Sequence, residues 1–156
     1  MMKMVVNMQS VFVDTNILVY FTDGSSHFHS SSYNAITSLL SQKTDLLVSS
    51  QIVREYYAVA SRSSQGYIAL SRQDIMSNIK YFQLICRVVS DETQNILMKA
   101  LELTENIAIG GRQIHDANIV ATMLVSGVHN LLTNNIAHFQ RFPSLINLVS
   151  LTEYEV

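Results

Sequence analysis

Three carboxylates interrupt hydrophobic stretches of this sequence and are the residues best suited to do chemistry. Asp14 directly follows the apolar run Val11–Val13 in "SVFVDTNILVY", Glu55 borders an apolar helical stripe, and Asp116 opens the apolar segment "DANIVATMLVSG". Burying an unpaired carboxylate is costly unless the charge is compensated or the group takes up a proton. We therefore expect a partner that compensates these charges.

Such a cluster of acids is suited to binding a divalent metal ion. Three carboxylates that lie together repel one another, and either protonation or a divalent cation relieves this repulsion. Oxygen ligands without a cysteine cluster or a histidine pair favour Mg²⁺ or Mn²⁺ over Zn²⁺. Such a metal contacts phosphate and activates water, and the sequence has no "GxxxxGK[ST]" loop for a nucleoside triphosphate. Each acid taken alone is more simply a helix cap or a surface charge, but the three together favour phosphodiester hydrolysis as the expected reaction.

The elements that must position these acids alternate between strands and helices. The apolar runs predict strands over Val11–Val13, Leu46–Ser49, Arg87–Val89, Asn130–Thr133 and Asn147–Leu151. Longer amphipathic or apolar stretches predict helices over Ser31–Ser41, Gln51–Arg62, Arg72–Ile85, Asp91–Glu105 and Gln113–Ser126, with Ser71 and Ser90 as N-caps and Gly127 as a C-terminal stop. This alternation predicts an α/β domain with a mostly parallel sheet covered by helices.

The carboxyl ends of parallel strands meet at one edge of such a sheet, where ligand sites form. Asp14 ends the first predicted strand, and Glu55 lies in the first turns of the helix after the second strand. Asp116 lies in the opening turn of the helix before the fourth strand, and Asn135 follows that strand. We expect these four side chains to meet at this edge.

The composition is compatible with one domain spanning residues 1–156. Hydrophobic residues make up 48% of the chain and charged residues 14%, against about 25% charged in an average soluble domain. So few charges favour a homo-oligomer over a monomer with a large core. A net charge of −2 excludes a global positive field for binding duplex DNA. The one cysteine, Cys86, is expected to fill the core, and the absence of a signal peptide or membrane span near the N-terminus predicts a cytoplasmic protein.

Four segments together resemble the acidic motifs of PIN-domain ribonucleases, most closely the VapC-type toxins of prokaryotic toxin–antitoxin pairs. They are "FVDTNILVY", "SSQIVREYYAVASR", "IHDANIVATML" and "LLTNNIAHFQRF", in that order, and the resemblance runs from about Phe12 to Leu151. It implies a three-layer sandwich with a central, mostly parallel sheet flanked by helices. It also implies Mg²⁺- or Mn²⁺-dependent cleavage of single-stranded or structured RNA, a homodimer, and a small antitoxin that blocks the site.

The resemblance also assigns roles to individual residues. Asp14, Glu55 and Asp116 match the three family acids and are the expected metal ligands. Thr133 matches the threonine or serine that opens the last motif, and Asn135 matches the fourth metal-site position. Asn135 is therefore the fourth expected catalytic residue, which would orient a water molecule or complete the site.

Two departures from the family pattern reduce the negative charge of the site. Asn135 stands where an aspartate is common, and His138 stands where the family often has an aspartate. They argue against a second metal ion and leave a one-metal site intact. They also leave open the alternative of a PIN-fold binding module that no longer cuts. Thr133, Arg54, Arg112 and Asn16 are candidate substrate contacts, with a solvated surface role equally open for the arginines.

Overall fold

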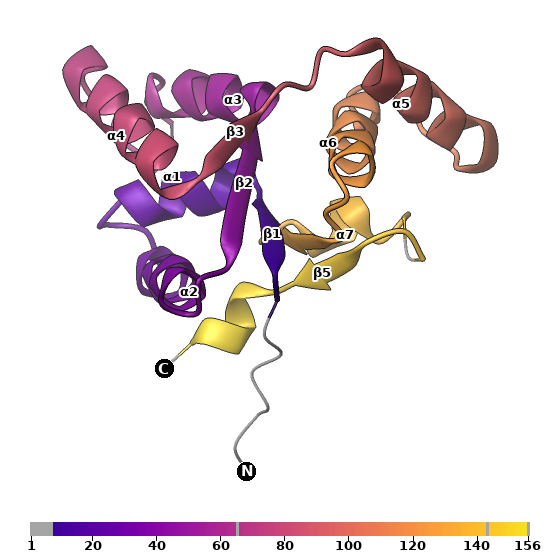
Figure 1. Ribbon diagram of the computed structural model, residues 1–156. Helices are drawn as coiled ribbons and strands as arrows, with labels where there is room; N and C mark the ends of the chain where they lie inside the picture. Colours follow the sequence, from indigo (N-terminus) through magenta and orange to yellow (C-terminus); the bar gives the residue numbers. More distant parts are fainter. Residues whose placement is uncertain (1–7, 65, 143, 156) are drawn as a thin grey trace.

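The computed structural model describes residues 8–64, 66–142 and 144–155. Within them the chain forms a parallel sheet with the strand order β3-β2-β1-β4-β5 (Figure 1). Its strands are β1 (Ser10–Val13), β2 (Asp45–Ser49), β3 (Arg87–Val89), β4 (Asn130–Leu132) and β5 (Asn147–Val149). The predicted α/β fold with a parallel sheet is confirmed.

Helices cover both faces of this sheet. They are α1 (Thr15–Thr22), α2 (His29–Ser41), α3 (Ser50–Ala60), α4 (Arg72–Ile85), α5 (Gln94–Asn106), α6 (Gln113–Val125) and α7 (Ile136–Phe139), and a 3-10 turn, η1, covers Leu151–Tyr154. In Figure 1, α1, α2, α3 and α4 gather on the left of β1, and α5, α6 and α7 on its right. This is the sandwich expected for a PIN-like chain. In the part of the chain that is described, no helix combines the length and the hydrophobicity that a membrane crossing needs.

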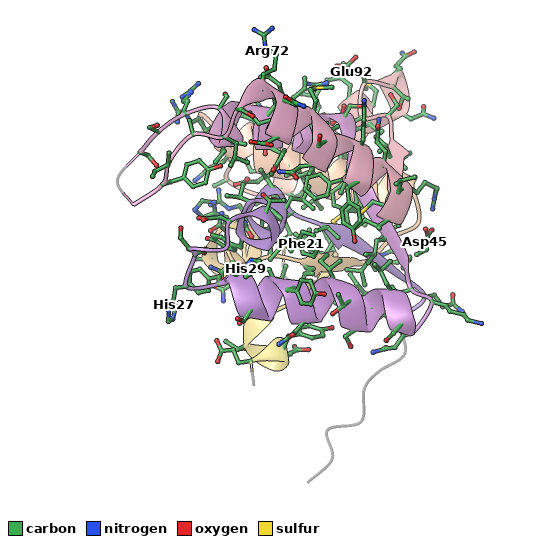
Figure 2. The ribbon with its side chains drawn as sticks, turned by 90° about the vertical axis from the view of Figure 1, so that its left-hand side faces the viewer. Phe21, His27, His29, Asp45, Arg72 and Glu92 are labelled. Atoms are coloured by element: carbon green, nitrogen blue, oxygen red, sulfur yellow. The ribbon has the colours of Figure 1, made fainter. Side chains whose placement is uncertain are left out.

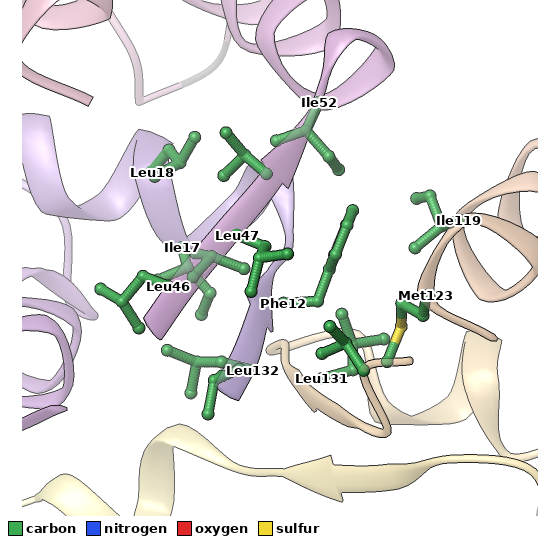
Figure 3. Close-up of a cluster of buried hydrophobic side chains, with 14 of the residues drawn as sticks. Phe12, Ile17, Leu18, Leu46, Leu47, Ile52, Ile119, Met123, Leu131 and Leu132 are labelled. Atoms are coloured by element: carbon green, nitrogen blue, oxygen red, sulfur yellow. The ribbon is translucent and has the colours of Figure 1, made fainter. Parts of the chain in front are cut away.

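The core is built around β1. Its residues Val11, Phe12 and Val13 are all fully buried, because a parallel strand between two helical layers has no solvent-facing side. Phe12 points toward Ile119 and Met123 of α6, while other buried side chains of the same cluster come from α1 and β2 (Figure 3). The position of β1 therefore fixes Asp14, which follows it, at the carboxyl end of the central strand.

Helix α1 was absent from the sequence-based prediction. The segment after Asp14 is apolar on most sides and rich in β-branched residues, so its pattern does not identify a helix. In the structure Asp14 serves as its N-cap, with the side chain accepting a hydrogen bond from the Thr15 N–H. The acid therefore has a structural role in addition to any chemical one.

The prediction that Ser90 caps the helix expected over Asp91–Glu105 is wrong. Thr93 is the N-cap of α5, and its hydroxyl accepts a hydrogen bond from the Ile96 N–H. The predicted first helical residue, Asp91, instead extends to α3, where its carboxylate accepts the Gln51 N–H at 2.7 Å. A carboxylate is stabilised there by the exposed N–H groups of a helix N-terminus. The segment before α5 therefore remains outside the helix.

One outer face carries an aromatic row that the prediction did not identify. Phe21 of α1 stacks between Tyr33 of α2 and Tyr81 of α4, with ring centroids 5.8 Å and 6.0 Å apart. Figure 2 looks onto this face and shows Phe21 between the two longer helices. The two tyrosines are 51% and 45% exposed, so they are aromatic side chains at the surface rather than in the core.

Candidate active site

A cavity of about 430 Å³ lies at the carboxyl end of β1, between α1 and α3 on one side and α6 and α7 on the other. All four predicted catalytic residues line it. The complete lining consists of Asp14, Thr15, Asn16, Val19, Tyr20, Glu55, Ala58, Val59, Asp116, Ile119, Asn135, His138 and Phe139. The topology thus brings together side chains that lie up to about 120 residues apart in sequence.

Asp14 is held in place by three hydrogen bonds. The Thr15 N–H donates to Oδ1 at 2.8 Å, and the Thr133 hydroxyl and the Asn16 side-chain amide donate to Oδ2 at 2.7 Å and 2.8 Å. The Thr133 hydroxyl in turn accepts the Asn135 N–H at 3.0 Å. Asn16 and Thr133, predicted as substrate contacts, therefore act first as residues that orient the carboxylate.

Burial and hydrogen bonding act in opposite directions on Asp14. The residue is only 5% exposed, and this burial raises the pKa of its carboxyl above the usual value. The hydrogen bonds from Thr133 and Thr15 favour the carboxylate and lower the pKa, while the nearby Glu55 charge raises it. The net shift is upward, so the site would be stabilised by a cation.

Glu55 is linked directly to α1 and, through Gln51, to α6. The Thr15 hydroxyl donates to Oε2 at 2.8 Å and the Gln51 side-chain amide donates to Oε1 at 2.7 Å. The Gln51 side-chain oxygen accepts a hydrogen bond from the Asn118 amide at 2.8 Å, which joins α3 to α6. Because Asn118 lies two residues after Asp116, this bridge sets the spacing between the helices that carry Glu55 and Asp116.

Asp116 lies in the first turn of α6 and is half-buried. Burial raises the pKa of its carboxyl, and the Glu55 charge raises it further. The nearby basic side chains of His138, Arg141 and His115 lower this pKa and so partly offset the burial. Basic side chains therefore gather on the α6 and α7 side of the cavity.

Neither of the two arginines predicted to contact the substrate is among the described residues that line the cavity. Arg54 is 60% exposed and pairs with Glu92 at 3.3 Å and with Asp91 at 3.9 Å. Arg112 is exposed at the N-terminal end of α6.

Three polar residues that orient the acids were not identified from the sequence: Thr15, Gln51 and Asn118. Gln51 precedes Glu55 by four residues on a helix, a spacing that places the two side chains on one face and is visible in the sequence. The contact between Gln51 and Asn118 depends on how α3 packs against α6, and no local pattern predicts it.

The donor atoms of the three acids in the cavity are oxygens, the type that a hard divalent cation prefers, although within the part of the chain that is described they are not arranged around a common point. Asp14, Glu55 and Asp116 line one cavity, and the Glu55 charge influences the pKa of both aspartates, so the three carboxylates lie within electrostatic reach of one another. In the described ranges, no group of three or more His, Cys, Asp or Glu side chains is arranged as a metal site. The oxygens of Asp14 and Glu55 are instead engaged by hydrogen-bond donors.

Comparison with known proteins gives a family and a set of similar folds. The model of the PIN domain matches residues 11–144, whereas no curated protein matches the chain. Two of the similar solved structures are complexes that contain VapBC proteins and DNA. VapBC2 from Rickettsia felis, bound to a promoter fragment, has a TM-score of 0.65 at 23% identity. The aligned region covers 90% of this chain and 98% of the chain from that structure. VapBC from Salmonella typhimurium has a TM-score of 0.64 at 19% identity and covers 92% and 99%.

A third structure is VapC20 from Mycobacterium tuberculosis, described as a sarcin-ricin loop cleaving toxin. Its TM-score is 0.58 at 18% identity, over 78% of this chain and 86% of its own. At these identities the likeness concerns the fold. The family-model match covers most of the sequence, including every acid of the cavity. The chain therefore belongs to the PIN domain family.

Proposed function

We propose that this protein is a divalent-metal-dependent endoribonuclease that hydrolyses phosphodiester bonds of single-stranded RNA. The observation that carries the proposal is the convergence of Asp14, Glu55 and Asp116, from three separate elements, on one cavity in a PIN-domain chain. When bound, Mg²⁺ or Mn²⁺ would activate a water molecule and neutralise charge on the scissile phosphate. The three carboxylates would hold the ion after exchanging some of their present hydrogen bonds for it.

The other residues of the cavity position these groups. Thr133 and Asn16 fix the orientation of the Asp14 carboxylate, and Thr15 links it to Glu55. Asn135 lies at the cavity wall, exposed to solvent, where its amide would orient a water molecule. His138 on the same wall offers a hydrogen-bond donor to a phosphate oxygen.

We further propose that the protein is the toxin of a toxin–antitoxin pair. The support comes from the similar structures, several of which are described as VapBC complexes, and from the VapC20 structure, described as a cleaving toxin. The partners would be a small antitoxin protein and a second copy of this chain. A homodimer would cover part of the exposed apolar surface, which includes Leu97, Met98 and Leu101 of α5.

The test is a cleavage assay on matched substrates. End-labelled single-stranded RNA, the same RNA as a duplex and single-stranded DNA of the same sequence are incubated with the protein, with Mn²⁺ or with EDTA. We expect cleavage of single-stranded RNA only, with Mn²⁺ only, and its loss in Asp116→Asn. The matched control, Glu105→Gln, neutralises an exposed acid outside the cavity and should cut like the wild type.

Three outcomes would contradict the proposal. Cleavage that persists in EDTA would exclude dependence on a divalent metal, and cleavage by Asp116→Asn at the wild-type rate would place the reaction elsewhere. No cleavage by a folded, metal-loaded protein would favour the alternative of a PIN-fold binding module.

A further inference from the structure

The cavity of the candidate active site has an apolar wall next to its acids. Val19 and Tyr20 of α1 and Ala58 and Val59 of α3 line this side. Val19 and Tyr20 are half-buried, Ala58 is exposed, and Val59 is 44% exposed. These apolar side chains are partly open to solvent and lie next to the carboxylates. They therefore provide a surface on which a ligand other than a metal ion can pack.

The aromatic member of this wall is fixed in orientation. The Tyr20 ring packs against Phe28 with centroids 4.9 Å apart and an interplanar angle of 39°. The Asn134 side-chain amide lies 3.5 Å from the Tyr20 hydroxyl, and the His29 ring nitrogen lies 2.9 Å from the Tyr20 carbonyl oxygen. A ring held in this way loses little freedom when a ligand packs on it, so the wall is preorganised for binding.

The other side of the cavity carries polar and charged groups beside two buried apolar side chains, Ile119 and Phe139. Asp116 and His138 line it, and Arg141 lies near enough to influence Asp116 electrostatically. A ligand that fits both walls has a flat apolar part and an anionic part. A nucleotide of RNA has both, with a base that can lie on an aromatic or aliphatic side chain and a phosphate that pairs with basic residues.

We propose that Val19, Tyr20, Ala58 and Val59 form a seat for one unpaired nucleobase of the RNA substrate, adjacent to the phosphate that the acids act on. This inference rests on the proposed function. It adds a feature that determines which part of the RNA is bound next to the acids. The cavity volume of about 430 Å³ lies at the small end of the range for ligand pockets, about 300–1,000 Å³. This volume has room for one nucleotide, which suits a base that is unpaired and turned away from its neighbours.

The test is a binding scan with missing bases. Short adenosine, cytidine and uridine homopolymers, labelled at one end, are prepared with a single abasic position that is moved along the chain. Binding is measured by fluorescence anisotropy in EDTA, in an Asp14→Asn background that reduces the repulsion between the empty site and phosphate. Removing the base at one position is expected to weaken binding about tenfold, the effect of losing one stacked base.

Three further variants in that background assign the effect to the seat. Tyr20→Leu keeps an apolar contact with Phe28 but removes the aromatic surface, and Val59→Gln adds a polar group at a position that is 44% exposed. Both should bind intact RNA more weakly and lose most of their sensitivity to the missing base. Tyr81→Leu, at a 45% exposed tyrosine outside the cavity, should keep the full sensitivity.

The proposal is overturned if no abasic position weakens binding, if no RNA binds, or if Tyr20→Leu and Val59→Gln keep the sensitivity of their parent. These results differ from failure of the proposed function. A protein that cuts single-stranded RNA but shows a flat scan lacks the seat, whereas a protein that shows the scan but never cuts has the seat without the activity.

Discussion

At the scale of single residues, hydrogen bonding and burial act in opposite directions on the pKa of Asp14. This residue caps α1 and accepts three hydrogen bonds, all of which favour the charged carboxylate. It is also buried beside Glu55, which favours the protonated acid, and the balance raises its pKa. A buried acid of this kind destabilises the metal-free protein once it is ionised, and a cation would offset that cost.

The stability of the metal-free protein should therefore fall as the pH rises. The pKa values of Asp14 and Asp116 in the folded state lie above the unfolded value of 3.8. The stabilisation from their protonated forms is complete below about that value and is lost as the pH rises through the folded pKa values. In EDTA, the free energy of unfolding measured in urea should decrease from pH 4 toward pH 7 less steeply for Asp14→Asn than for the wild type. Equal slopes in the two proteins would contradict the assignment.

The neutral residue Asn135 gives a second prediction at this scale. Asn135→Asp adds a fourth negative charge to the cavity, which should increase repulsion in the empty site and attraction to a cation. The variant should therefore melt at a lower temperature than the wild type in EDTA and bind Mn²⁺ more tightly by calorimetry. If affinity and metal-free stability both stay unchanged, Asn135 lies too far from the acids to belong to the site.

At the scale of elements, the bridge between α3 and α6 decides how the acids are spaced. Gln51 receives a hydrogen bond from Asn118 and donates one to Glu55, so a single side chain connects the two helices that carry Glu55 and Asp116. Its Nε2 also lies 3.4 Å from the His115 carbonyl oxygen. Gln51 is 8% exposed, so water cannot readily replace these bonds.

Gln51→Leu should consequently weaken both stability and activity. The partly buried partners left without a hydrogen bond should reduce the free energy of unfolding by about 1 kcal/mol. Misplacement of Glu55 should reduce the cleavage rate at saturating RNA, with little change in KM. Gln73→Leu, at an exposed position of α4, is the matched control and should change neither. A wild-type rate in Gln51→Leu would show that the bridge does not position the acid.

Much at this scale could be predicted from the sequence, for identifiable physical reasons. The three central strands, β1, β2 and β4, are largely apolar because both faces of the sheet are covered there. The acids stand out because each interrupts or borders an apolar segment. Helix α1 was missed because its residues are apolar on most sides. Ser90 was misassigned because Asp91 binds the N-terminus of a helix distant in sequence. The bridge through Gln51 and the apolar wall depend on the packing of helices, which no local pattern encodes.

At the scale of the whole molecule, the site exists only in the folded chain. Asp14 comes from the end of β1, Glu55 from α3 and Asp116 from α6, and these elements meet only when the sheet and both helical layers are assembled. A ligand that binds the folded state alone stabilises it by RT ln(1 + [L]/Kd), about 2.7 kcal/mol at a concentration 100 times Kd. Metal binding and stability should therefore be coupled through the entire fold.

The most direct measurement of the three-acid metal site is the melting temperature in excess Mn²⁺ compared with EDTA, for the wild type and for Asp14→Asn, Glu55→Gln and Asp116→Asn. The wild type should melt at a higher temperature with Mn²⁺, and each variant should lose most of this increase because each removes one charged ligand. Asp74→Asn, which changes an exposed acid in the first turn of α4, should keep it. Superimposed wild-type curves, or variants that retain the full increase, would contradict the assignment of these carboxylates to a single metal site.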